Sequence, residues 1–481
     1  MKIWIRRNKF KFLALTLVAL LVSVYLITAG GLWALSRMAE STHSPPDTTE
    51  VTSKEINKMR LIDNGMASLY QRLHLIHGAK KTIELEFFIY DIDQASRLLT
   101  QALVERAHQG VKIRLLVDFS APVFQLKPAY AHFMKSHGIE VRYYNTSAIY
   151  RIVSSQHRSH RKLLIVDDES LVTGGRNIAN DYFDLGETYN FLDSDIEVRG
   201  PITKSVVNSF NLYWNSDLTT NSDSYALTKK PVIQQQVASF LETNEKDSAT
   251  LSKINDVGAK NYAAGIDREC NDLTFVTDLP GHNESSRKVF NTIVKTLSEA
   301  KNEIWAESPY FIMKNGGLEI LQDLHNRKVS LSVLTNSLYS TDASYAVAAL
   351  YLNENQLAAT GLSLYAFRGE AVEGHSSHSE GRWGTHAKRA VIDSKTVMIG
   401  TYNIDPRSAN LNSELLFVCR NNPELAADMR ASIAKRFKHS NRIIAKGQIQ
   451  ADESILANSS LTDLIKFAIL LPLSNLFDFL L

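Results

Sequence analysis

The chain has 481 residues, of which 44% are hydrophobic and 22% are charged, and its formal net charge is +2. This composition is typical of a globular protein long enough for two or three domains. A net charge this close to zero argues against a protein that coats nucleic acid, although it does not exclude a local basic groove. The two cysteines, Cys270 and Cys419, are too few for a disulfide framework or a zinc site, so we expect two buried free thiols.

An apolar segment near the N-terminus predicts a membrane anchor. Residues 12–35 carry no charged side chain, and about 20 apolar residues suffice for a helix to cross a bilayer. Lysines and arginines cluster before this segment, which places the N-terminus in the cytoplasm and the body of the protein on the periplasmic side of a bacterial inner membrane. A cleaved signal peptide is the alternative, but the segment is longer than usual for one and no clean cleavage site follows it.

Changes in composition divide the chain into six segments. They are a basic end with the anchor (1–40), a polar linker (41–60), a first half (61–217), an inter-half connection (218–264), a second half (265–450) and an apolar C-terminal segment (451–481). Charges at Asp463 and Lys466 and a proline at Pro472 make the last segment poor for spanning a membrane. It is either a helix lying in the membrane interface or a core helix packed on the body.

Both halves show strands alternating with helices. In the first half we expect strands at 82–90, 111–117 and 140–144 and helices at 98–108 and 129–136; in the second, strands at 303–311, 329–335 and 362–367 and a helix at 318–326. A further helix is expected near 233–241 in the connection. This order predicts an α/β fold of two similar halves, with mainly parallel or mixed sheets flanked by helices and related by pseudo-twofold symmetry.

One set of residues occurs twice at a fixed spacing. The first copy has His160, Lys162, Asp167, Gly174 and Asn177, and the second has His386, Lys388, Asp393, Gly400 and Asn403. Each pair differs by the same number of positions (386 − 160 = 226). A single copy would be weak evidence, whereas two copies in register predict that each half supplies one set to a shared site.

These residue types suit the cleavage of a phosphodiester. Residues two apart on a strand point the same way, so each histidine can share a pocket with its lysine. One neutral imidazole can attack phosphorus to form a phosphohistidine, and the second can donate a proton to the leaving alkoxide. The lysines and the amides of Asn177 and Asn403 can hold the phosphate oxygens. Asp167 and Asp393, at the strand ends, complete the catalytic candidates.

Neither a metal nor another cofactor is expected. The sequence has no Walker loop, no carboxylate-rich metal cage and no dinucleotide fingerprint. His375 and His378 lie three apart in the loop 369–384, which we interpret as a mobile loop beside the site rather than a metal centre.

A histidine used in this way needs a partner on its other ring nitrogen. Asp195 and Glu414 follow the two motifs at similar distances and fall on the next strands. We therefore expect Asp195 to orient His160 and Glu414 to orient His386.

Both motifs resemble those of the phospholipase D superfamily, and most closely those of bacterial cardiolipin synthases and their phospholipase D-like relatives. The segments that carry the resemblance are 174–178 (GGRNI), 405–408 (DPRS), 307–311 (ESPYF), 335–337 (TNS) and the apolar C-terminus, and it covers about 64–481. It implies two α/β halves meeting at one site, a phosphohistidine intermediate and phosphatidyl transfer, with His160 as nucleophile and His386 as acid and base. Gly175 and Thr401 depart from the pattern, because many members carry serine there.

The leading functional interpretation is transfer of a phosphatidyl group between two phosphatidylglycerols to give cardiolipin. The same site with water as acceptor would make the protein a phospholipase D. An exported nuclease is weakened by the near-neutral charge and the anchor, so we expect phospholipid substrates and a membrane as partners and no nucleic acid. The sequence does not determine the donor lipid, the oligomeric state or whether an accessory protein is needed.

Overall fold

The computed structural model describes residues 49–119, 126–146, 156–224, 245–281, 287–313, 316–375, 381–443, 454–472 and 474, with isolated residues in 16–23 and 235–241. The predicted anchor at 12–35 therefore lies almost wholly outside the described residues. Within the described ranges, no helix combines the length and the apolar character needed to cross a membrane.

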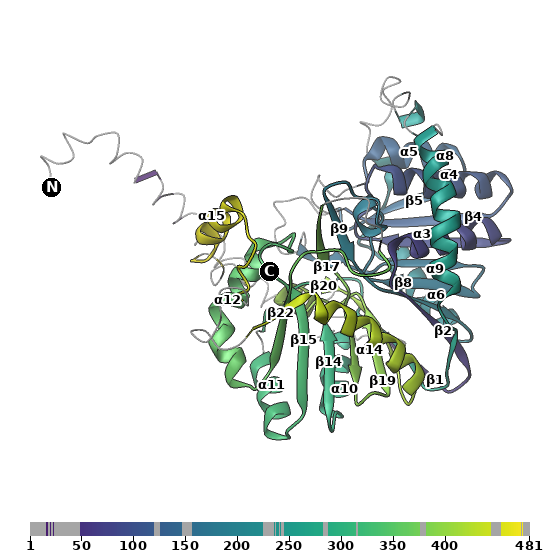
Figure 1. Ribbon diagram of the computed structural model, residues 1–481. Coiled ribbons are helices and arrows are strands. Elements are labelled where there is room, and N and C mark those ends of the chain that lie inside the picture. The colour runs from purple at the N-terminus through teal and green to yellow at the C-terminus, as the bar shows by residue number, and fades with distance from the viewer. Residues whose placement is uncertain are drawn as a thin grey trace, which may run out of the picture.

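Two nine-stranded sheets form the body of the protein, one from each half of the chain (Figure 1). The first runs in the order β11 (Thr219–Asn221), β5 (Ile139–Tyr144), β4 (Lys112–Asp118), β3 (Thr82–Phe87), β7 (Leu163–Val166), β8 (Ser170–Gly174), β10 (Asp195–Arg199), β2 (Asn57–Ile62) and β12 (Arg268–Cys270). The second runs β22 (Ser440–Ile443), β16 (Ser363–Phe367), β15 (Ser330–Asn336), β14 (Glu303–Glu307), β18 (Arg389–Ile392), β19 (Thr396–Gly400), β21 (Leu415–Cys419), β13 (Leu273–Thr277) and β1 (Glu50–Ser53).

The two sheets repeat one topology, as the duplicated motif predicts. In each sheet three neighbouring strands are parallel (β3, β4 and β5; β14, β15 and β16), and every other pairing is antiparallel. The sheets are therefore mixed, with antiparallel strands in the majority. The parallel strands need helical crossovers, whereas β7 and β8, like β18 and β19, follow each other through tight hairpins.

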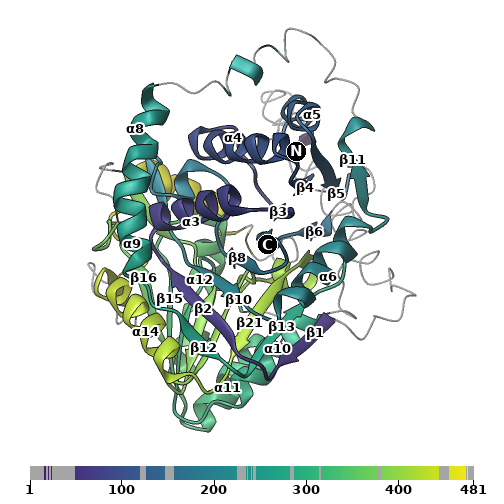
Figure 2. The same ribbon diagram turned by 90° about the vertical axis from the view of Figure 1, so that its right-hand side faces the viewer.

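Helices cover the sheets in each half. The first half has α3 (Gly65–Gly78), α4 (Gln94–His108), α5 (Pro128–Ser136), α6 (Thr203–Trp214) and the short helices η3 (Asn180–Tyr182) and η4 (Ser222–Ser224). The connection contributes α8 (Glu245–Lys253), whose Asp247 pairs with Arg97 of α4, and η6 (Ile254–Gly258) and α9 (Ala259–Ala263), which run beside α3 (Figure 2). The second half has α10 (Lys288–Ser298), α11 (Gly317–Asn326), α12 (Ser344–Ala359), α13 (Pro406–Asn410), α14 (Pro423–Lys438) and α15 (Leu461–Leu470).

Local sequence explains where these helices begin. The Asp93 side chain accepts a hydrogen bond from the backbone N–H of Ser96, whose hydroxyl in turn accepts one from the N–H of Asp93, a capping box that starts α4. Asn422 caps α14 in the same way through the N–H of Leu425, with Pro423 at the first helical position. Both helices then bury their apolar faces against the sheet of their own half.

The boundary between the halves is interleaved rather than clean. Strand β1, from the predicted linker, pairs with β13 in the second sheet, and β12, from the predicted second half, pairs with β2 in the first. Residues of both sheets also share one core, in which Ile196 and Val198 of β10 lie with Ile399 of β19 and Phe417 of β21. The halves are thus joined by exchanged strands and by continuous apolar packing.

The expectation of two free thiols is wrong, because Cys270 of β12 and Cys419 of β21 form a disulfide. The two residues are 149 positions apart, and only the strand exchange brings them together, so their spacing in the sequence gives no hint of the bond. The disulfide ties the first sheet to the second within the shared core. Disulfides persist in oxidising compartments.

Replacing both cysteines by alanine is expected to lower the free energy of unfolding by about 2–5 kcal/mol, since the bond closes a long loop in the unfolded chain. Urea unfolding of the variant and of the oxidised wild type measures the difference. Reduced wild-type protein serves as the control and should behave like the variant. Identical midpoints for oxidised and reduced protein would show that the bond does not stabilise the fold.

Candidate active site

Both motif histidines lie where a strand of one half meets a strand of the other. Strand β6 (Arg158–Ser159) pairs in parallel with β20 (Asn412–Ser413), and β17 (Arg382–Thr385) pairs in parallel with β9 (Tyr189–Leu192). The backbone N–H of His160 donates to the carbonyl of Ser413 at 3.0 Å, and that of His386 donates to Leu192 at 2.8 Å. Each histidine is thereby fixed against the opposite half.

The His160 ring is held by the second half of the chain. Its Nδ1 lies 3.0 Å from Oε1 of Glu414 and 3.1 Å from the carbonyl oxygen of Thr401, so Nδ1 carries the proton and donates it. This tautomer leaves the lone pair on Nε2. Phe88 packs edge-on to the ring, with a centroid separation of 5.3 Å, and fixes its plane.

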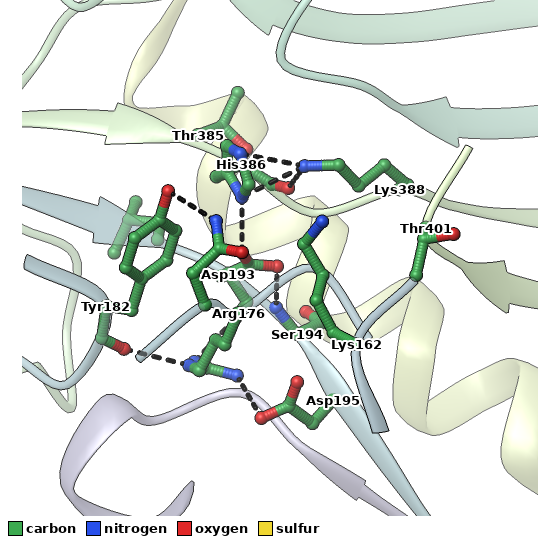
Figure 3. Close-up of polar contacts among 12 residues, drawn as sticks. Lys162, Arg176, Tyr182, Asp193, Ser194, Asp195, Thr385, His386, Lys388 and Thr401 are labelled. Atoms are coloured by element: carbon green, nitrogen blue, oxygen red, sulfur yellow. Dashed lines mark hydrogen bonds and ion pairs between the residues drawn. The ribbon is translucent and has the colours of Figure 1, made fainter. Parts of the chain in front are cut away.

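The His386 ring is held in turn by the first half. Its Nδ1 lies 2.6 Å from Oδ2 of Asp193, and the Nζ of Lys388 lies 3.0 Å from its Nε2 (Figure 3). The rings of Tyr182 and Phe191 pack against the imidazole at 5.2 Å and 4.8 Å between centroids. Both imidazoles are thus nine-tenths buried, with one ring nitrogen bound to a carboxylate.

The predicted assignment of the orienting carboxylates is wrong in both cases. Glu414 contacts His160 rather than His386, and Asp193 rather than Asp195 contacts His386. The cause is the register of the short parallel pairs. Ser159 lies opposite Ser413, so the next residues, His160 and Glu414, are also neighbours. Thr385 lies opposite Leu192, which places His386 beside Asp193 in the same manner.

Asp195 has a structural role instead. Its carboxylate accepts hydrogen bonds from Ser68 Oγ at 2.6 Å, from Arg72 at 2.8 Å and from Arg176 at 3.2 Å. Arg176 also donates to the carbonyl oxygen of Asp193 at 2.8 Å. These fully buried arginines therefore fix the loop that carries the His386 partner (Figure 3).

The two lysines lie beside the histidines as the spacing predicts. Lys162 Nζ donates to the carbonyl oxygen of His160 at 2.7 Å, and Lys388 Nζ donates to that of His386. Burial lowers the pKa of Lys162 to about 7 and that of Lys388 to about 8, although Glu414 and Asp193 oppose the shift. The charge of Lys388 also lowers the pKa of Lys162, as expected for two amino groups that face one region.

The titration of the histidines and carboxylates follows from their burial. Burial, reinforced by the lysine charges, lowers the pKa of His160 well below its usual value and that of His386 to about 3, so both rings are neutral near pH 7. Burial raises the pKa of Glu414 to about 7. Burial acts in the same direction on Asp193, but the charge and hydrogen bond of His386 outweigh it and leave its pKa below the usual range.

The motif asparagines, Asn177 and Asn403, which are predicted to bind phosphate, are both buried. Asn177 accepts from the backbone N–H of Ile89 at 3.2 Å and donates to the hydroxyl of Tyr182 at 2.9 Å. The Oδ1 of Asn403 is buried and has no hydrogen-bond partner among the described residues. Asn177 thus positions the ring that packs on His386, and a contact of either amide with phosphate remains a prediction.

Asp167 and Asp393 lie away from the site, so their inclusion among the catalytic residues is wrong. Each sits five residues beyond its lysine, about 16 Å along an extended strand. The Asp167 carboxylate accepts the backbone N–H groups of residues 80–82 at 2.6–2.9 Å, and that of Asp393 accepts those of residues 301–303 at 2.7–3.1 Å. These bonds lower the pKa of both carboxyl groups and tie the hairpin to the start of the central strand.

We expect Asp393→Asn to destabilise the fold while leaving catalysis nearly intact. Losing charge-assisted hydrogen bonds should lower the free energy of unfolding by about 1–3 kcal/mol. At a temperature where the variant is fully folded, kcat/KM should stay within about threefold of the wild-type value. Urea unfolding and initial rates provide the two measurements, and Asp167→Asn is the matched variant in the other half. A large loss of kcat in a fully folded variant would restore these residues to the catalytic set.

Buried acids support both motifs at equivalent positions. Glu86, near the end of β3, accepts from Ser159 Oγ at 2.7 Å, and Glu307, at the end of β14, accepts from Thr385. Each thereby holds the residue directly before a catalytic candidate histidine. Glu86 and Glu307 thus have equivalent roles in the two halves.

The two departures from the family pattern have a steric explanation. A Cβ on Gly175 would lie only 2.2 Å from Oδ1 of Asp193, so a serine there would displace the carboxylate that holds His386. At the corresponding place, Thr401 Oγ1 donates to Oε2 of Glu414 at 2.5 Å and its carbonyl accepts from His160. Both positions therefore serve the orienting carboxylates.

Sequence reasoning missed the aromatic rings and Asp193. Phe88, Tyr182 and Phe191 look like ordinary core residues in the sequence. The strand register of the structure shows which residue of the first half corresponds to Glu414: β10 and β21 are equivalent strands, in which Asp195 opposes Gly174 and Leu416 opposes Gly400. Counting back from those partners aligns Asp193 with Glu414.

The loop 369–384 is only partly described. His375 Nδ1 lies 3.2 Å from Oδ2 of Asp184 and its ring packs edge-on to Trp383, whereas His378 lies outside the described residues. Among the described residues, no group of three metal-ligating side chains comes together.

Two halves of one topology that each bring a histidine and a lysine to a shared region define a phospholipase D-like protein. The family model described as "Cardiolipin synthase, PLD-like domain" matches residues 73–214 and 293–437, which is more than half of the chain. The chain therefore belongs to this family, the cardiolipin synthase-like branch of the phospholipase D superfamily.

Individual relatives agree with this placement. The chain is 28% identical to cardiolipin synthase C of Escherichia coli K12, over 74% of this chain and 80% of that protein. It is 26% identical to cardiolipin synthase 1 of Bacillus anthracis, over 80% and 67%, and 28% identical to an uncharacterized protein of Helicobacter pylori strain J99, over 80% of each. A crystal structure of phosphatidylserine synthase from Haemophilus influenzae Rd KW20 matches 89% of this chain and 98% of its own, with a TM-score of 0.63 and 14% identity, and shares the fold.

Proposed function

We propose that this protein is a membrane-associated phosphatidyl transferase that makes cardiolipin from phosphatidylglycerol through a phosphohistidine intermediate. The observation that carries the proposal is the pair of buried histidines, each bound through Nδ1 to a carboxylate of the opposite half. Such pairing fixes the tautomer and raises the basicity of Nε2. Two imidazoles held in the same way, each with a lysine beside it, suit a double displacement at one phosphorus.

The contacts of the rings favour His160 as the nucleophile. Its Nε2 has no hydrogen-bond partner among the described residues, and its lone pair is available for attack. The Nζ of Lys388 lies 2.9 Å from Nδ1 and 3.0 Å from Nε2 of His386, so its positive charge lies against that ring and makes the ring a weaker nucleophile. The bound phosphodiester is anionic, which favours protonation of a nearby imidazole, so His386 becomes the acid that protonates the departing glycerol oxygen. It then accepts the proton of the incoming hydroxyl.

An exposed apolar helix supports a lipid substrate presented at a membrane. Leu461, Ile465 and Ile469 of α15 are 74%, 52% and 60% exposed, while Phe467 packs on Tyr351 of α12. Asp463 of α15 pairs with Arg382 of β17, the strand that leads into His386. These exposed apolar side chains support the interfacial location expected for the C-terminal segment, and Asp463 holds the helix beside the strand that leads into the site.

The decisive experiment supplies phosphatidylglycerol in water and identifies the products by mass. Cardiolipin with free glycerol supports the transferase, whereas phosphatidic acid supports the hydrolase with water as acceptor. Turnover of labelled oligonucleotide in place of lipid would support a nuclease and contradict the proposal.

The pH dependence of kcat/KM should be bell-shaped, with a maximum near pH 7. Glu414 must be ionised to accept the His160 proton, so activity falls as the pH drops through its pKa of about 7. The lysines must be charged to hold phosphate, so activity falls as the pH rises, first through the Lys162 pKa of about 7 and then through the Lys388 pKa of about 8. In Lys162→Arg, the descending limb should move to higher pH, because a guanidinium keeps its charge. A flat profile from about pH 6 to pH 9 would contradict these assignments.

A further inference from the structure

An apolar groove lies between α10 and α11 on one face of the second sheet. It is narrow, with a cavity volume of about 100 Å³, and it is open to solvent. Ile293 and Leu297 of α10 and Ile320 of α11 form its walls, and Ile304 and Val333 of the sheet form its floor. Among the residues that line it, the only ionisable acid is Asp405, which is engaged as the N-cap of α13.

At the equivalent place in the first half, the described helices pack closely on the sheet. There α3 and α4 flank the central strand, and their apolar side chains Leu69, Ile76, Leu99 and Leu103 are fully buried in one core. Helix α9 and η6 of the connection pack along α3 as well (Figure 2). In the second half the corresponding walls, including Ile293 and Ile320, are only partly buried. Because the two halves share one topology, the open groove is a specific feature of the second half.

The groove adjoins the candidate active site through one backbone segment. Residues 401–405 contact the candidate active site on one side and the groove on the other. Thr401 bonds to Glu414 and, through its carbonyl, to His160, whereas Tyr402 and Ile404 line the groove. The groove therefore begins directly behind the segment that positions the nucleophile, and it reaches the edge of the site at Asp405 and Pro406.

A cation stands at the mouth of the groove. The guanidinium of Arg287 lies 4.0 Å above the ring of Phe290, which lines the groove beside Tyr402. The Nε and Nη2 atoms of Arg287 are buried and have no hydrogen-bond partner among the described residues. Buried guanidinium nitrogens are rarely left without an acceptor, so their state points to an anionic group supplied by a ligand.

We propose that this groove binds one acyl chain of the phospholipid substrate and that Arg287 contacts an anionic oxygen of the same lipid. The proposal rests on the proposed phosphatidyl transfer. An apolar channel with a single cation at its mouth matches an anionic amphiphile, and a lipid phosphate at His160 can pass its acyl chain over the 405–406 edge. The groove thereby selects a long-chain lipid as donor and fixes its phosphorus relative to the imidazoles.

Photolabelling tests occupancy without requiring turnover. Phosphatidylglycerol with a diazirine near the end of one acyl chain is added in mixed micelles to the full-length His160→Ala protein, and labelled peptides are identified by mass spectrometry. We expect label in α10 and α11. Ile320→Trp, which fills the groove from α11, should reduce this label about tenfold, while Gln322→Trp, an equally large change on the exposed face of α11, should not. Label confined to α15, or unchanged by Ile320→Trp, would overturn the proposal.

Chain-length selectivity provides the second measurement. In the active protein, Ile320→Trp should lower the ratio of kcat/KM for dioleoyl over dihexanoyl phosphatidylglycerol about tenfold, and Gln322→Trp should leave the ratio unchanged. If Ile320→Trp does not fold, Val294→Gln places a polar amide in the same groove. If α10 and α11 are labelled but the active protein turns over no lipid, the acyl site is supported and the proposed reaction is refuted. Failure of the acyl site and failure of the proposed reaction therefore give different results. An unchanged ratio in a folded groove variant counts against the acyl site alone.

Discussion

Replacing His160 or His386 by alanine is expected to lower phosphatidyl transfer by at least about 10⁴-fold while the protein stays folded. Each ring is a central participant: without His160 there is no nucleophile, and without His386 the glycerol alkoxide must leave unprotonated. Circular dichroism and the urea midpoint check the fold. His74→Ala, a histidine exposed on α3, is the matched control and should retain full activity. Retained activity in both site variants would refute the assignment.

A substrate with an activated leaving group separates the two roles. An aryl phosphodiester that releases p-nitrophenolate needs little help from an acid, so the His386→Ala variant should still release one equivalent in a burst and then stall. The phosphoryl group should then be found on His160, as an acid-labile adduct in the peptide containing residue 160. The His160→Ala variant should show no burst. A burst in His160→Ala and none in His386→Ala would exchange the roles.

The duplicated motif made the centre of this site predictable. Two copies in register required two similar halves, and the i and i+2 spacing on a strand placed each lysine beside its histidine. The structure confirms both points, since the sheets share one strand order and Lys162 and Lys388 each contact the histidine of their own motif. Local sequence was enough, because each contact joins residues two apart in the chain, although both pairs lie between strands (β6 and β7; β17 and β18) rather than within one.

Contacts between the halves were not predictable in the same way. Strands β6 and β20 are two residues long and carry no periodic pattern, yet their register decides that Glu414 meets His160. The disulfide depends on the exchange of β12, which follows from the path of a whole connection rather than from any motif. The acidic residue of each motif was wrongly predicted to be catalytic, for a different reason. A residue that recurs at a constant spacing can serve the fold rather than the chemistry. Asp167 and Asp393 each anchor a hairpin by accepting backbone N–H groups.

The second large effect is expected from the orienting carboxylates, through Glu414→Gln and Asp193→Asn. An amide can donate to Nδ1, which moves the ring proton to Nε2 and removes the lone pair that the chemistry uses. We expect kcat/KM for phosphatidylglycerol to fall by about 10²–10⁴-fold in each variant. Asp195→Asn is the comparison: it weakens two buried arginine contacts and should lower the free energy of unfolding by about 3–5 kcal/mol.

Glu414→Gln and Asp193→Asn should slow different steps, because Glu414 holds the nucleophile His160 and Asp193 holds the acid His386. Glu414→Gln acts on His160, so the burst of p-nitrophenolate from the aryl diester should slow along with turnover. Asp193→Asn acts on His386, so the burst should remain fast, since that leaving group needs no acid, while transfer from phosphatidylglycerol is slow. Rapid-quench measurement of the burst rate in each variant tests this. Equal slowing of the burst in both variants would mean that the carboxylates stabilise one shared arrangement of the rings rather than two separate proton positions.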